Sequence, residues 1–116
     1  IADRWPQNEV PGFRFDGPQL AKTRGGGRWV EMLRAREEKL YDWMASYPPA
    51  LLIRLNIDAE TAHARKPDHK LSALREKVAV IPGLTFNGAN ILALDGRDPA
   101  DHVVDESLRA VRAALA

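Results

Sequence analysis

Two short aliphatic segments constrain the fold of this chain most strongly. Segments 51–57 and 91–94 are rich in Leu and Ile, and the first is bounded by Pro49 and Asp58. Short apolar runs of this kind are typical of strands buried on both faces of a parallel sheet. Parallel strands require a crossover connection, and the residues between the two segments are long enough to supply one.

Helical patterns alternate with these segments. Apolar residues recur at helical spacing from Arg28 until Pro48-Pro49 ends the run, and Asp58 can cap a short helix through Ala64 or Arg65. A further stripe follows Pro67, and a last helix begins with Asp98 as its N-cap. The three apolar stripes are Trp29, Leu33, Leu40, Met44 and Tyr47; Leu71, Leu74, Val78 and Ile81; and Val104, Leu108, Val111 and Leu115. This alternation predicts an α/β fold, a parallel sheet flanked by four helices.

The strand count is low for such a fold. Residues 1–4 look like the end of a third strand, and Pro and Gly then disfavour regular structure over residues 6–27. Two full strands and one strand end are too few for an ordinary parallel sheet, yet the apolar helix faces need one. We therefore expect residues 1–116 to be a single domain, the C-terminal portion of a larger domain whose beginning is missing or was removed. A second copy that supplies the missing surface is the alternative.

The composition of the chain limits the kinds of partner that it can bind. Seventeen Lys and Arg face 16 Asp and Glu, so the net charge of +1 gives no global field for nucleic acid or anionic lipid. No apolar run approaches the roughly 18 residues that a membrane span needs. The absence of Cys excludes disulfides and thiolate chemistry and fits a reducing compartment, so we expect a cytoplasmic protein. The histidines show no metal-ligand spacing, and no metal site is predicted.

Three features could carry chemistry, and each has a plainer alternative. Asp3-Arg4 follows a predicted strand end, where an Arg can grip a phosphate or can form a surface salt bridge. The glycines of segment 24–28 precede a helix and could face an anion or serve as a flexible linker. No GxxxxGK[ST] or GxGxxG pattern can be written through the chain.

The third feature is the basic segment 63–77, with five Lys and Arg against two acidic residues. Arg65 and Lys66 stand at its start, directly before Pro67. Cations on a mobile, Pro-interrupted connection suit a lid over a polyphosphate. An ordinary solvated helix face is the alternative.

Four segments, taken in order, carry a family resemblance: Asp3-Arg4-Trp5, the Pro-Pro-strand-Asp segment 48–58, the helical segment 59–65 and segment 91–115. They resemble the C-terminal half of a P-loop nucleoside monophosphate kinase, most closely the thymidylate kinase family. Trp5 stands where that family has Tyr, Phe or His, and the family's Ala-Tyr-Gln segment is replaced by Lys22-Thr23-Arg24.

The resemblance implies ATP-dependent phosphoryl transfer, with Mg²⁺, to a nucleoside monophosphate, with dTMP the favoured acceptor. It implies that Arg4 holds the acceptor phosphate with Asp3 nearby, that Arg65 and Lys66 stabilise the transferring phosphoryl group, and that Gly96 and Arg97 line the adenine. Because the Walker A loop is absent from this sequence, we expect these 116 residues alone to be inactive. The rival hypothesis is a non-catalytic, kinase-like binding module that acts through a partner chain.

Overall fold

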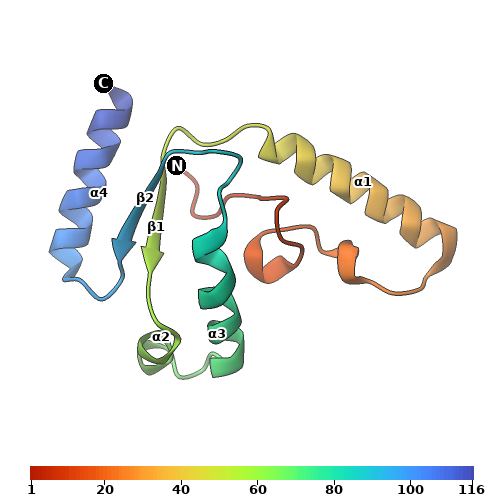
Figure 1. Cartoon of the computed structure of the whole chain (residues 1–116), viewed down its shortest axis with the longest axis horizontal. Coiled ribbons are helices and arrows are strands. Elements are labelled where there is room, and N and C mark those ends of the chain that lie inside the picture. The colour runs from red at the N-terminus through yellow and green to blue at the C-terminus, as the bar shows by residue number, and fades with distance from the viewer. The chain divides into compact units, whose positions relative to one another are not determined.

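The computed structural model describes residues 1–116 and confirms the predicted α/β class, with four α-helices and a two-stranded parallel sheet (Figure 1). In chain order the elements are α1 (Gly27–Ala45), β1 (Leu52–Asn56), α2 (Ala59–Arg65), α3 (Leu71–Val80), β2 (Ile91–Asp95) and α4 (Ala100–Leu115). Single 3-10 turns occur at Phe13–Phe15, Leu20–Lys22 and Ile81–Gly83. The chain divides into two compact units, Ile1–Pro48 with Phe86–Gly88 and Pro49–Thr85 with Ala89–Ala116. None of the helices is long and apolar enough to cross a membrane.

The second unit is built on the pairing of β1 with β2. Leu52 pairs with Ile91 and Asn56 with Asp95, so both strands end at the same edge. The predicted cap at Asp58 is confirmed, because its carboxylate accepts a hydrogen bond from the Thr61 amide at 2.8 Å and starts α2. Helices α2 and α3 pack against each other in the crossover, and α4 packs along β2.

Burial in this unit differs from the sequence prediction in two places. The Leu55 side chain on β1 is 55% exposed and β2 has no fully buried residue, so the prediction of strands buried on both faces is wrong for both. The predicted apolar stripe of α4 is also exposed, from Val104 to Leu115, while Val103 and Ala110 are half-buried. The reason is physical: two strands present too little surface to cover every apolar helix face.

Two local predictions are also wrong. Residues 1–4 form no strand, since a strand end is stable only where a neighbouring strand accepts its hydrogen bonds. Helix α4 begins one residue later than predicted, with Pro99 at the N-cap position and no side-chain cap. The Asp98 carboxylate instead lies 3.9 Å from the His102 imidazole.

In the first unit a single glutamine closes the long loop. The Gln7 side chain is 1% exposed; its Nε2 donates to the carbonyls of Val10 at 2.6 Å and Phe15 at 2.9 Å. Its Oε1 accepts from the amides of Glu9 and Val10 at 2.7 and 2.8 Å. A Cβ on Gly17 would lie 2.0 Å from the Val10 carbonyl oxygen, so only glycine fits there. The predicted irregular segment is therefore a closed loop rather than a loose one.

Helix α1 anchors the segment that follows this loop. The Glu37 carboxylate accepts the amides of Gln19 and Leu20 at 2.8 and 2.7 Å, and Arg34 donates to the Leu20 carbonyl at 3.1 Å. These bonds use the polar face of the helix. Its predicted apolar stripe is largely exposed, with Trp29 at 75%.

Replacing Gln7 by Ala should lower the free energy of unfolding of the first unit by about 2–4 kcal/mol, because buried amides and carbonyls lose their partners. All three Trp residues lie in this unit, so urea unfolding followed by Trp fluorescence reports it. The matched control is Gln19→Ala, at an exposed position, which should change stability by less than about 0.5 kcal/mol. Equal effects of the two substitutions would contradict the role given to Gln7.

Candidate functional site

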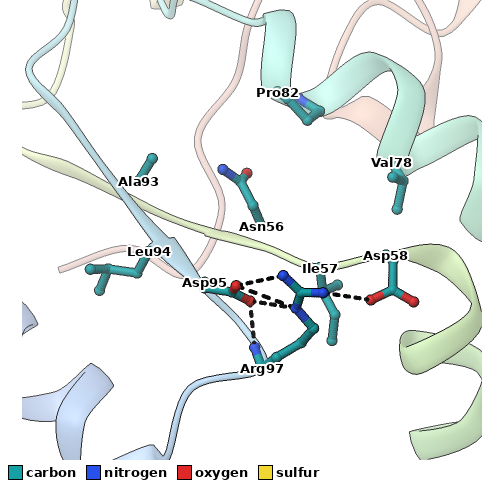
Figure 2. Close-up of a pocket in the computed structure, with 9 residues that line it drawn as sticks. All are labelled: Asn56, Ile57, Asp58, Val78, Pro82, Ala93, Leu94, Asp95 and Arg97. Atoms are coloured by element: carbon teal, nitrogen blue, oxygen red, sulfur yellow. Dashed lines mark hydrogen bonds and ion pairs between the residues drawn. The ribbon is translucent and has the colours of Figure 1, made fainter.

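The parallel register brings the carboxyl ends of β1 and β2 together. A pocket of about 460 Å³ opens at this edge, within the range of small-molecule sites. Its lining comes from the strand ends, the turns that follow them, α3 and the 3-10 turn after α3: Asn56, Ile57, Asp58, Val78, Pro82, Ala93, Leu94, Asp95 and Arg97 (Figure 2). The carboxyl edge of an open α/β sheet is where ligands of such folds bind.

Asp58 contributes one carboxylate to the pocket from the start of α2. Both of its oxygens accept a hydrogen bond from the Thr61 hydroxyl at 2.7 Å, and Oδ2 also accepts from the Thr61 amide. These bonds stabilise the charged form and lower the pKa of Asp58, most of all through the Thr61 side chain. Asp58 therefore both caps α2 and lines the pocket.

Asp95 and Arg97 form the strongest ion pair of the pocket. Arg97 Nε donates to Asp95 Oδ1 at 3.0 Å and Nη2 donates to Oδ2 at 2.8 Å, while the Arg97 amide donates to Oδ1 at 2.9 Å. Figure 2 shows the same guanidinium reaching towards Asp58, whose Oδ1 lies 3.9 Å from Nη1. The hydrogen bonds from Arg97 lower the pKa of Asp95 from 3.8 to about 2.

Arg65, Gly96 and Arg97, three of the six residues predicted for the site, meet at this edge. Arg65, the last residue of α2, donates from Nη1 to the Gly96 carbonyl at 2.7 Å. Gly96 in turn donates its amide to the Asn56 carbonyl at 2.6 Å, and a Cβ on Gly96 would lie 3.1 Å from that same oxygen. Lys66 follows as the exposed C-cap of α2.

Asp3 and Arg4 lie in the first unit, and both are exposed. Arg4 Nη1 is 3.6 Å from Asp16 Oδ1, with the Arg4 side chain 74% exposed. Exposed pairs of this kind add little stability, typically about 0–1 kcal/mol. The Arg4 guanidinium thus has a weak partner, and its role towards an acceptor phosphate stays a prediction.

Sequence reasoning missed the two carboxylates of the pocket. The sequence pattern predicts Asp58 as a helix cap, and Asp95 directly follows the predicted strand 91–94, but neither acid is predicted as a site residue. The available signal was positional, because each acid directly follows or ends a predicted parallel strand, and such residues share one sheet edge.

A magnesium ion, which the family resemblance implies, does not fit the residues of this edge as they stand. Magnesium sites usually combine one or two carboxylates with substrate phosphates. Both oxygens of Asp58 accept from Thr61, and both oxygens of Asp95 accept from Arg97.

The chain is similar to two curated proteins of Escherichia coli K12. It is 71% identical over 115 residues to the uncharacterized ATP-binding protein YghS, a match that covers 99% of this chain and 48% of that protein. It is 43% identical over 111 residues to the uncharacterized ATP-binding protein YghR, covering 96% of this chain and 44% of that protein. The chain therefore spans about half the length of these relatives. No protein-family model and no solved structure matches it.

Substitution of Arg97 by Gln should raise the pKa of Asp95 from about 2 towards its usual 3.8, because the cationic donor is lost. A depressed pKa stabilises the fold above the unfolded value, so the contribution of Asp95 is present above about pH 4 and is lost as pH falls towards 2. Carboxyl ¹³C chemical shifts against pH give the measurement. Arg75→Gln is the control: it should raise the pKa of Glu60, its own partner, and leave Asp95 unchanged.

Proposed function

We propose that the protein binds ATP at the carboxyl edge of β1 and β2 and that the complete protein transfers a phosphoryl group from it to a nucleoside monophosphate, with dTMP as the favoured acceptor. The observation that carries the first half is the 71% identity to a protein named as ATP-binding. The second half rests on the resemblance of Asp3-Arg4-Trp5 and segments 48–65 and 91–115 to thymidylate kinases.

Charge divides the proposed nucleotide site into two parts. The pocket contains the carboxylates of Asp58 and Asp95 and the single guanidinium of Arg97, so its formal charge is negative. A triphosphate would be repelled there, whereas a base or sugar offers N–H and O–H donors to carboxylates. Arg97 and Gly96 would therefore contact the nucleoside, over the apolar surface of Val78 and Pro82.

The phosphates would lie towards the basic segment that begins at the end of α2. Arg65 and Lys66 are exposed there, and their positive charge would stabilise the negative charge that develops on the oxygens of a transferring phosphoryl group. ATP supplies the phosphoryl group, and the planar guanidinium of Arg65 can bind two of its oxygens. Arg4 would hold the acceptor phosphate in the same way, with Asp3 beside it.

The binding-module alternative is supported by different observations. Apolar faces of α1 and α4 are exposed, as large apolar patches at protein interfaces are. On that alternative the pocket edge would be a remnant of a kinase fold without turnover.

Two measurements separate these hypotheses. Calorimetric titration with ATP should give saturable binding, and a coupled assay on the protein from its complete reading frame should give turnover with dTMP. ATP binding without turnover on any nucleoside monophosphate would favour the binding module. Turnover with another acceptor only would overturn the dTMP assignment, and absence of ATP binding would overturn the proposal.

Substitution of Arg4 by Lys tests the acceptor site. Lysine keeps the charge and loses the planar fork, so kcat/KM for the acceptor should fall about tenfold or more, with little change in the KM for ATP. Arg112→Lys, at an exposed position of α4, is the matched control and should leave both unchanged. If Arg4→Lys lowers the Tm by several degrees at full activity, Arg4 is a structural partner of Asp16 instead.

A further inference from the structure

The hydrogen bond from Arg65 to Gly96 joins two parts of the site that lie 31 residues apart. Its acceptor is the carbonyl of the residue directly before Arg97. On the sheet side the Gly96 amide donates to the Asn56 carbonyl at 2.6 Å, and within the turn the Asp98 amide donates to the Asp95 carbonyl at 3.1 Å. Besides the bonds within the turn 95–98, the β1 backbone therefore holds it on one side and the Arg65 side chain holds it on the other.

Orientation of the Gly96 carbonyl matters for the pocket. The peptide unit that carries this carbonyl also carries the Arg97 amide, which donates to Asp95 Oδ1 at 2.9 Å. A peptide unit is planar, so a bond that holds the carbonyl also fixes the direction of the amide. The hydrogen bond from Arg65 to the Gly96 carbonyl therefore also helps to orient the Arg97 amide, which is part of the Asp95–Arg97 pair at the pocket.

The remaining donors of Arg65 leave room for a second partner. Only Nη1 is engaged, and the structure shows no hydrogen bond from its Nε or Nη2. The guanidinium carries five N–H donors in a fixed plane. One side chain can therefore hold the turn while it still offers donors to an anion.

We propose that Arg65 is a positioning residue that fixes the turn 95–98 and thereby sets Arg97 at the pocket for the nucleoside part of the ligand. The identity of the ligand rests on the proposed function, whereas the hold on the turn does not. Because Arg65 ends α2 and directly precedes Lys66 and Pro67, this contact also ties the basic segment to the pocket.

Hydrogen exchange of the ligand-free chain tests the hold on the turn. In Arg65→Ala the amides of Gly96, Arg97 and Asp98 should exchange about fivefold faster, the effect of losing one hydrogen bond of about 1 kcal/mol. Arg75→Ala is the matched control, because it also removes an exposed arginine contact from this unit. Arg75 on α3 pairs with Glu60 on α2 at 3.0 Å and does not contact the turn 95–98. Arg75→Ala should leave these three amides unchanged, and Arg65→Lys should restore part of the protection because its ammonium can still donate.

Calorimetry with two probes then separates positioning from direct phosphate contact. If Arg65 positions the turn, Arg65→Ala should weaken binding of adenosine, which has no phosphate, as well as ATP, each by about fivefold or more. Weaker binding of ATP alone, with adenosine unchanged, would overturn the link to the pocket.

The two proposals fail separately. Unchanged exchange at residues 96–98 in Arg65→Ala overturns the positioning role, whether or not ATP binds. Faster exchange in a protein that binds neither probe supports the hold on the turn and overturns the nucleotide site instead.

Discussion

Parallel pairing of β1 with β2 is the interaction on which the candidate site depends. In a parallel pair both strands run to the same edge, so the residues after Asn56 and after Asp95 become neighbours although a long crossover separates them in sequence. An antiparallel pair would place those turns at opposite ends. The pocket and the contact of Arg65 with Gly96 follow from this register, whereas the Asp95–Arg97 pair is local to the turn after β2.

The same crossover explains why the two ends of the site are linked. Asp58 stops the strand and caps α2 in one step, and α2 is short enough that Arg65 at its end still reaches the turn after β2. The length of α2 is limited by Pro67, which cannot continue the hydrogen-bonding pattern of a helix.

Periodicity and capping explain how much could be predicted from the sequence. The α/β class, both strands, the limit set by Pro48-Pro49 and the cap at Asp58 depend on residues close in sequence, so they were predictable. The closed loop around Gln7 was not, because its side chain bonds backbone groups that no pattern identifies in advance. The predictions of burial failed for a different reason. A stripe such as that of α4 shows which face is apolar, but not whether any surface covers it.

The charge of the site also depends partly on residues close in sequence and partly on residues that only the fold brings together. The positive charge of segment 63–77 can be counted in the sequence. The negative charge of the pocket arises only because the fold places Asp58 and Asp95 in the lining of the same pocket. Arg97 neutralises only one of the two, and it does so through bonds strong enough to hold the pKa of Asp95 near 2. The carboxylates thus remain charged at neutral pH, beside cations that begin at Arg65. A ligand with hydrogen-bond donors at one end and negative charge at the other suits this arrangement of carboxylates and cations, and a nucleotide is such a ligand.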